Sequence, residues 1–407
     1  MTEIRPVEPG TAVASPPVDD APPATTFAYQ PGLDGLRAIG ITAVVLFHAS
    51  FTAHWLGRYG SWLGVDLFFV LSGFLITSLL LREFGVHGRF SLKNFYIRRA
   101  LRLYPVIVVC VLVAVALRLL IPSSPHSPSW AGISSIAFYY ANWARQTTGT
   151  DPIGGTFGHL WSLSVEEQFY LAWPFLVWSV LALGGRRRAL IVISSTLIAI
   201  VATVRYRVWH DALHTIHGQP NALRTNLRVA RHAWNIVYYG SFTRSDGLLI
   251  GCLLAALLGF HPRVPARWVR TLVGALAFGA IVLDLVIADR VRHAFYPTFL
   301  TTWGFLAFNL GVAVVVLHVI YSPRAPLPRA LSVAPLVWIG RRSYGIYVAH
   351  VIVDEGFASA HLGSAPWMGV AAAVTLVLAA VSYRYYEAPV LRLKSRFATP
   401  PVPRHTT

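Results

Sequence analysis

Runs of about 20 predominantly apolar residues recur along the whole chain, and this is the length of α-helix that crosses the hydrocarbon core of a bilayer. The 407-residue sequence is 55% apolar and only 13% charged, which is about half the charged fraction of an average soluble domain. Backbone groups inside a bilayer must find hydrogen-bond partners within the chain, and apolar runs of this length do so as helices. The sequence therefore predicts an all-α, polytopic membrane helix bundle.

About ten spans are predicted from these runs. They lie near residues 36–54, 61–82, 101–121, 163–184, 188–206, 243–260, 268–288, 298–320, 335–355 and 366–388. A stretch at 131–144 is too short to cross a bilayer and rich in aromatic residues, so we expect it to be interfacial or re-entrant. We expect residues 31–392 to form one membrane domain. Residues 1–30, which lack a signal-peptide pattern, and residues 393–407 are predicted to be cytoplasmic tails, the first of them disordered.

The basic residues set the expected orientation. The net charge is +17, but Lys and Arg stand in short clusters between apolar runs, which is typical of cytoplasmic loops and argues against nucleic-acid binding. Both termini are therefore predicted to be cytoplasmic, in the cytoplasmic membrane of a bacterium. The predicted loop 205–242 is an exception, because it is basic although this count places it outside. Cys110 and Cys252 lie inside spans and form neither a disulfide framework nor a metal site.

The first span carries two ionisable residues, and such groups are costly inside a bilayer. Arg37 lies at its cytoplasmic end, and His48 follows eleven residues later. On a helix this spacing returns to nearly the same face and covers about 16 Å. A neutral imidazole at mid-membrane could accept a proton, so His48 is a candidate general base. The alternative is a core histidine that is hydrogen-bonded to a neighbouring helix.

A cluster of arginines begins the third span. Arg98, Arg99 and Arg102 follow Lys93 in the stretch FSLKNFYIRRALRLYP. Such a cluster can simply set topology, but planar guanidinium groups also suit phosphates at the mouth of a cavity. In the preceding span, small residues at mid-depth allow either close helix contact or a narrow ligand passage. These are Ser72 and Gly73, with Asp66 nearer the outer surface.

The densest group of polar residues is the stretch TFGHLWSLSVEEQFYLAWP, which begins with His159. Its adjacent carboxylates, Glu166 and Glu167, point about 100° apart on a helix, so at least one should face the bundle interior. Tyr170 follows them by one turn.

The ninth span repeats the design of the first, with arginines at its cytoplasmic end and His350 deep inside. Ser343, Tyr347 and His350 share one stripe of this helix. Two further pairs are expected to neutralise each other: Arg244 with Asp246, and Arg384 with Glu387.

Taken in order, these segments resemble the bacterial membrane acyltransferase family often called acyltransferase-3, which includes O-antigen, peptidoglycan and macrolide O-acyltransferases. The matching segments are LDGLRA ahead of His48, GVDLFFVLSGFLIT, the Arg-x-x-Arg of Arg99 and Arg102, HLWSLSVEEQFYLAWP, TRSDGLLIG, SYGIYVAH and YRYYEAPV. The resemblance implies ten core helices, acyl-coenzyme A as cytosolic donor and a hydroxyl acceptor, usually on a carbohydrate. It also implies that Arg37 and His48 are essential and that Arg99 and Arg102 lie near the nucleotide phosphates.

Many relatives carry an extracytoplasmic hydrolase-like domain after the membrane part, whereas this chain stops soon after Arg396. We therefore expect a smaller acceptor than a wall polymer. A macrolide sugar and a lipid-linked saccharide both fit.

The hypothesis from sequence is a membrane O-acyltransferase that uses acyl-CoA, with acetyl-CoA the expected donor, and has no permanently bound cofactor. Three sets of residues are assigned. The catalytic set is His48, Arg37, Glu166, Glu167, Tyr170 and His350; the donor-binding set is Arg98, Arg99, Arg102, Ser72 and Gly73; the acceptor-binding set is Asp66, His159, Arg244 and Asp246. The expected order in depth runs from arginines at the cytoplasmic mouth, through histidines, to carboxylates at the outer edge.

Two other classes of protein remain open at this point. A proton-coupled transporter also uses His, Glu and Arg residues inside the membrane. A scaffold or sensor that recognises lipids or sugars is the second. The arginine-rich mouth ahead of a deep histidine favours the enzyme. Membrane lipid is an expected partner, and a homo-oligomer is possible on the sequence.

Overall fold

The structure is a computed structural model that describes residues 29–53, 63–124, 126–147, 153–185, 187–218, 223–259, 265–293, 298–360 and 365–397. Within these ranges all regular secondary structure is helical, as predicted. Apart from residues 29 and 30, the predicted N-terminal tail lies outside the described residues. So does the part of the C-terminal tail after residue 397.

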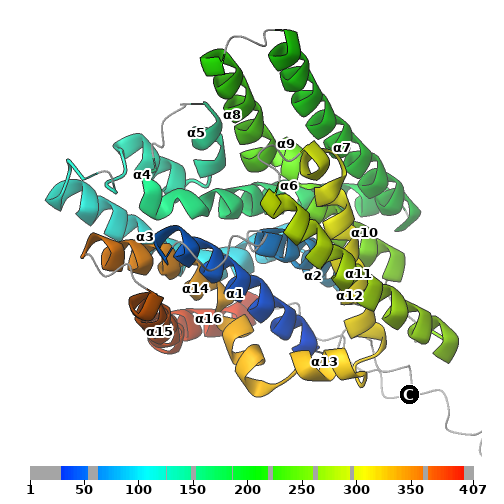
Figure 1. Cartoon of the computed structure of the whole chain (residues 1–407). Helices are drawn as coiled ribbons and strands as arrows, with labels where there is room; N and C mark the ends of the chain where they lie inside the picture. Colours follow the sequence, from blue (N-terminus) through cyan, green and yellow to red (C-terminus); the bar gives the residue numbers. More distant parts are fainter. Residues whose placement is uncertain are drawn as a thin grey trace, which may run out of the picture.

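The first half of the chain folds as follows (Figure 1). Its helices are α1 (Pro31–Ala53), α2 (Gly64–His87), α3 (Leu92–Leu120), α4 (Trp130–Ala137), α5 (Ala141–Thr147), the 3-10 helix η2 (Gly155–Leu160), α6 (Trp161–Ala182) and α7 (Arg187–Gly218).

The second half continues with shorter elements between long helices. They are α8 (Leu223–Tyr239), α9 (Ser241–Arg244), α10 (Asp246–Leu258), α11 (Arg267–His293), the π-helix η3 (Leu300–Gly304), α12 (Phe305–Tyr321), α13 (Pro326–Leu331), α14 (Ala334–Ser359), α15 (Ala365–Ser382), the π-helix η4 (Tyr383–Glu387), α16 (Ala388–Arg392) and the 3-10 helix η5 (Leu393–Phe397).

Each of the ten predicted spans overlaps one or more helices of the structure in its described residues. Among the described residues, six stretches are long and apolar enough to cross a bilayer: Pro31–Ala49, Gly64–His87, Leu92–Leu120, Arg187–Gly218, Thr301–Tyr321 and Pro366–Phe397. Helix α10 has 13 residues and is about 20 Å long, short of the roughly 30 Å of a hydrocarbon core. The number of crossings therefore stays a prediction.

The stretch predicted to be interfacial or re-entrant forms two short helices. Helix α4 has eight residues and α5 has seven, so neither reaches half of the roughly 20 residues that a crossing needs.

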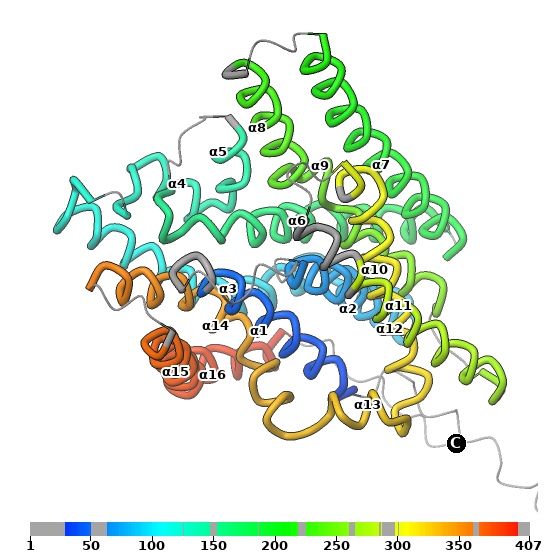
Figure 2. The backbone as a smooth tube through the Cα atoms, in the orientation of Figure 1, coloured from blue at the N-terminus to red at the C-terminus, as the bar shows by residue number. Residues whose placement is uncertain are grey.

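The prediction of a loop at 205–242 is wrong for the described residues, because 205–218 and 223–239 are helical. Helix α7 continues to Gly218, and α8 returns beside it as a hairpin that projects from the bundle in Figures 1 and 2. The face of α8 that carries Ala233 packs on Trp209 and Ala212 of α7. The arginines of α8 lower its mean hydropathy, so a search for apolar runs does not indicate this helix.

Helix α1 lies beside α14 from the other end of the sequence (Figure 2). A glycine allows this close approach, because a Cβ atom at Gly340 would collide with the backbone carbonyl of Asp34. The two helices run in the same direction, since Arg37 contacts Ser343 and His48 contacts His350. The first and ninth predicted spans thus bring their polar residues together.

Helices α2 and α10 form a second close pair. A Cβ atom at Gly73 would collide with the backbone carbonyl of Leu248, and the Cys252 Sγ atom donates to the Gly73 carbonyl at 3.5 Å. Gly73 therefore serves helix packing, which is one of the two roles that its size allowed. Ser72, its neighbour, faces a cavity on the other side of α2.

Candidate active site

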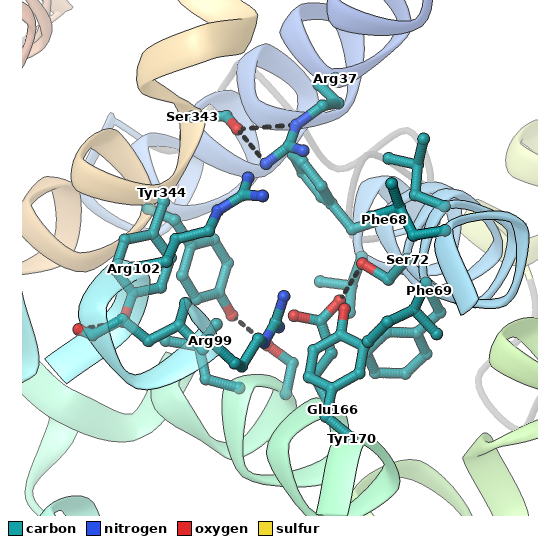
Figure 3. Close-up of a pocket in the computed structure, with 18 residues that line it drawn as sticks. Arg37, Phe68, Phe69, Ser72, Arg99, Arg102, Glu166, Tyr170, Ser343 and Tyr344 are labelled. Atoms are coloured by element: carbon teal, nitrogen blue, oxygen red, sulfur yellow. Dashed lines mark hydrogen bonds between the residues drawn. The ribbon is translucent and has the colours of Figure 1, made fainter. Parts of the chain in front are cut away.

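A cavity of about 100 Å³ lies between α1, α2, α3, α6 and α14 (Figure 3). Most of its wall is apolar, but its polar groups converge from five helices. Those groups are Arg37, Ser72, Arg99, Arg102, Ser162, Glu166, Tyr170, Ser343, Tyr344 and Tyr347. The structure thus gathers residues that the sequence analysis singled out on five separate segments.

Arg37 is held at the edge of this cavity by α14. Its Nε and Nη2 atoms both donate to the Ser343 hydroxyl at 3.3 Å. Ser343 is 2% exposed, so this contact fixes the guanidinium direction from a rigid, buried anchor. Figure 3 shows the Arg37 guanidinium turned toward the same space as those of Arg102 and Arg99.

Arg99 is fixed by two contacts on α6. Its Nη2 atom lies 2.9 Å from Glu167 Oε1, and its guanidinium carbon lies 3.4 Å from the centre of the Tyr170 ring. A planar cation stacked on an aromatic face and paired with a carboxylate has a defined orientation. Arg102, one turn further along α3, lines the same cavity.

Glu166 lies inside this arginine cluster. Its Oε1 atom accepts a hydrogen bond from Ser72 at 2.7 Å. The positive charges of Arg99, Arg37 and Arg102 attract its carboxylate. Both adjacent carboxylates thus face the bundle interior.

The predicted order in depth is wrong for these carboxylates, because they lie beside the arginines and not beyond the histidines. The reason is the direction of α6. It begins at Trp161, next to His159, so Glu166 and Tyr170 lie about 8 to 14 Å further toward the arginines.

A second cavity, of about 590 Å³, adjoins the first. The two share Ile76, Leu79, Arg99 and Arg102 as lining residues, so the arginines stand at their junction. The polar lining of the outer cavity also includes Arg82, Glu83, His87, Arg98 and Lys394. Arg98 pairs with Glu83 at 2.9 Å, which leaves this cavity strongly positive.

The inner end of the first cavity is closed by Tyr347 and Ser162. The Tyr347 hydroxyl donates to the His159 carbonyl at 2.6 Å and lies 2.5 Å from the Ser162 hydroxyl. The Tyr347 ring lies 5.3 Å from the ring of His159 and 5.6 Å from that of His350, centre to centre. Tyr347 therefore separates the cavity from a cluster of histidines.

His48, His159 and His350 form that cluster. Their ring centres are 4.9 Å apart for His48 and His350, 5.0 Å for His159 and His350, and 6.1 Å for His48 and His159. The sequence placed these residues on three segments, and the structure brings them together. Within the described residues, however, no group of His, Cys, Asp and Glu has the geometry of a metal site.

The hydrogen bonds of the cluster define its protonation. His350 Nδ1 lies 2.7 Å from the Tyr347 carbonyl and 3.2 Å from the Ile346 carbonyl. Carbonyl oxygens only accept, so Nδ1 carries the proton and the Nε2 atom of His350 is an acceptor. By the same logic His48 Nδ1, at 2.9 Å from the Val44 carbonyl, is protonated. The lone pair of a neutral His48 is therefore on its Nε2 atom.

The expected pairing of Arg244 with Asp246 is wrong. Arg244 Nη2 lies 2.9 Å from Asp66 Oδ2, and Asp246 Oδ2 lies 2.8 Å from Arg205 Nη1. All four side chains are 0% exposed. Arg205 was predicted to belong to an outer loop, and no local pattern revealed its partner. Asp66, Arg244 and Asp246 are thus separate from the described lining of both cavities.

The expected pairing of Arg384 with Glu387 is also wrong. Glu387 accepts a hydrogen bond from the Ser382 hydroxyl at 3.1 Å. Among the described residues it forms no ion pair with Arg384.

The site residues assigned from sequence omit four polar residues of the outer cavity, which are Arg82, Glu83, His87 and Lys394. Glu83 lies in the last turns of α2, beyond the predicted end of its span. Lys394 was assigned to the C-terminal tail, but residues 393–397 form η5 and pack on α3.

The sequence of this chain matches the model of one protein family, described as an acyltransferase domain, over residues 30–384. The chain belongs to this acyltransferase family. The match covers most of the helical bundle, including every residue of the inner cavity. The arginine-lined cavity and the histidine cluster are therefore features of an acyltransferase domain.

Curated relatives agree with this assignment. The chain is 34% identical over 378 residues to a candidate peptidoglycan O-acetyltransferase of Bacillus subtilis strain 168, covering 89% of this chain and 55% of that protein. It is 32% identical over 376 residues to the peptidoglycan O-acetyltransferase OatA of Listeria monocytogenes, covering 89% and 56%. A candidate O-acetyltransferase of Staphylococcus aureus strain MSSA476 is 31% identical over 374 residues, covering 89% and 57%.

The chain spans about half the length of these relatives. No solved structure matches the chain.

Proposed function

We propose that this chain is a membrane O-acyltransferase that moves an acyl group, expected to be acetyl, from acyl-CoA to a hydroxyl of a carbohydrate or glycosylated molecule. The observation that carries the proposal is the convergence of Arg37, Arg99 and Arg102 on one cavity whose inner end adjoins three histidines. Family membership supports acyl transfer, and the names of the relatives support O-acetylation.

The two joined cavities fit the shape and charge of acyl-CoA. Its anionic nucleotide needs a wide, positive site, and the outer cavity has both properties. Its pantetheine arm is long, thin and mostly uncharged, and the narrower inner cavity is lined mainly by apolar groups. The thioester would then arrive near Tyr347.

His48 is proposed as the general base. Its Nε2 atom would remove the proton of the acceptor hydroxyl as the hydroxyl oxygen attacks the thioester carbonyl. The C–S bond then breaks, and the coenzyme A thiolate recovers the proton from His48. Charge on the carbonyl oxygen in this step would be stabilised by nearby donors, for which the Ser162 and Tyr347 hydroxyls are placed.

This mechanism requires the inner end of the cavity to open. Tyr347 and Ser162 separate the cavity from His48, so donor binding would have to part these two side chains. The closed arrangement would separate the histidine cluster from the cavity while no donor is bound.

The acceptor is proposed to approach His48 from the side opposite the arginines. On the sequence we expected a macrolide sugar or a lipid-linked saccharide, and the relatives add peptidoglycan as a third acceptor to test. This chain covers little more than half of each relative, so the acceptor of a relative does not carry over to it directly. All three acceptors are therefore tested.

The test is coenzyme A release from acetyl-CoA by the full chain in lipid vesicles, with each acceptor supplied in turn. Exchanging His48 for Ala should lower turnover by about 100-fold or more, the usual contribution of a general base. The control is His318→Ala, because His318 is buried on α12 outside the described lining of both cavities. Full turnover by a folded His48→Ala protein would rule out the mechanism.

The same vesicles separate transfer from transport. A proton-coupled transporter would move label or protons across the membrane without releasing coenzyme A. A proton gradient that drives uptake, with no acyl product in any arm, would favour that alternative.

A further inference from the structure

We propose that Lys394 of the C-terminal turn η5 binds the 3′-phosphate of coenzyme A and thereby selects it over dephosphorylated donors. The proposal rests on the proposed use of acyl-CoA and adds a binding residue from outside the arginine motif of α3. Four features carry it: the docking of η5, the charge around Lys394, its position in the outer cavity, and the order of groups along coenzyme A.

The turn η5 is docked on α3 and α2 through Arg98. The Nη1 atom of Arg98 donates to the Phe397 carbonyl at 2.6 Å, and its Nη2 atom pairs with Glu83 at 2.9 Å. One guanidinium therefore holds the end of α2, the start of α3 and η5 together. This attachment keeps Lys394 at the rim of the outer cavity.

Lys394 has unfavourable electrostatic surroundings. The positive charges of Arg102, Arg99 and Arg98 repel its ammonium group. Within the described part of the chain no carboxylate pairs with Lys394, and the acidic residue of the outer cavity, Glu83, is engaged by Arg98. Like charges held this close repel one another, so a bound anion would relieve the repulsion.

The position of Lys394 indicates which phosphate it would bind. Arg99 and Arg102 line both cavities, whereas Lys394 lines the outer one alone. Along coenzyme A, the pantetheine arm leads to the diphosphate, and the ribose with its 3′-phosphate lies beyond. With the arm in the inner cavity, the diphosphate reaches Arg99 and Arg102 at the junction. The 3′-phosphate then reaches the outer cavity, where Lys394 lies.

The side-chain chemistry agrees with this assignment. A phosphate monoester is a compact anion, and an ammonium group on a flexible stem binds it as a point charge. The bridging diphosphate has several oxygens in a fixed pattern, which suits the planar guanidinium groups of the two arginines. The two residue types thus match the two kinds of phosphate in the order in which they lie.

The experiment compares acetyl-CoA with 3′-dephospho-acetyl-CoA as donors for the full chain in vesicles. Lys394→Ala should raise the KM for acetyl-CoA about tenfold, the effect of losing one charge-assisted contact. It should leave the KM for the dephospho donor unchanged. Lys394→Arg keeps the charge and should retain most of the preference. The control is Arg396→Ala, which removes a neighbouring charge of η5 that lies outside the described lining of the outer cavity.

Two outcomes would overturn the assignment. An equal rise in both KM values would mean that Lys394 acts on the diphosphate or on folding, and no rise would mean that it does not bind donor. If the unaltered protein released no coenzyme A from either donor, the proposed donor itself would be wrong. The unaltered protein therefore distinguishes failure of the proposed function from failure of the Lys394 assignment.

Discussion

The Nδ1 atom of His48 on α1 lies 3.2 Å from the Nε2 atom of His350 on α14. Since His350 Nδ1 donates to the Tyr347 carbonyl, its Nε2 atom accepts, and His48 Nδ1 donates to it and to the Val44 carbonyl. The contact fixes the tautomer and the ring direction of His48. If His48 is the base, as proposed, this contact makes His350 a positioning residue for it, a narrower role than the catalytic one predicted from sequence.

Two replacements of His350 test whether the position of its acceptor atom matters for turnover. The amide oxygen of Gln can take the place of Nε2, whereas Asn is too short to reach His48. We expect His350→Gln to retain a substantial part of kcat and His350→Asn to lose about 10- to 100-fold, as for other partners that orient a functional histidine. The KM for acetyl-CoA should stay constant in both. Equal losses in the two variants would show that His350 does not act through its acceptor atom.

The contacts of Arg99 with Glu167 and Tyr170 predict that its replacement changes KM more than kcat. Arg99→Lys keeps the charge but loses the flat group that stacks on Tyr170 and the fork that meets Glu167. We expect the KM for acetyl-CoA to rise about tenfold with a smaller change in kcat, since the contact is to the donor and not to the reacting atoms. A variant with a lowered kcat and an unchanged KM would place Arg99 in the chemical step instead.

Helical periodicity was sufficient to predict part of this site. The spacing of Arg37 and His48 put both on one face of α1, and the stripe of Ser343, Tyr347 and His350 did the same for α14. Sequence could not show that these two faces meet. That contact depends on the absence of a side chain at Gly340, which lets α14 approach the backbone of α1.

The buried ion pairs show that closeness in sequence is a poor guide to which charged residues pair. Residues two positions apart point to different sides of a helix, so Arg244 and Asp246 were poor candidates for a pair. Their real partners lie 178 and 41 residues away along the chain. Such a choice depends on how four helices pack, and a single sequence does not record it.

The folded protein should lose stability when one charge of a buried ion pair is removed. Asp66→Asn leaves the Arg244 guanidinium 0% exposed without a charged partner, which typically costs about 3 to 5 kcal/mol. We expect a lowered thermal midpoint in detergent, with part of the loss recovered when Arg244 is replaced by Met in the same protein. The comparison is Asp211→Asn, because Asp211 is exposed on α7 and should leave the midpoint unchanged. Additive losses in the double variant would contradict a direct pair.

The close packing of α2 on α10 should tolerate no added methyl group at Gly73. A Cβ atom there would overlap the Leu248 carbonyl, so Gly73→Ala must push the helices apart, at a cost of about 1 to 3 kcal/mol for an overpacked contact. Because Ser72 is the next residue and donates to Glu166, the same shift should disturb the cavity and lower turnover. Gly279→Ala is the control, since a Cβ atom at Gly279 on α11 meets open space. A Gly73→Ala protein with normal stability and turnover would mean that the two helices can separate freely, and that Ser72 does not need its position to keep Glu166 in place.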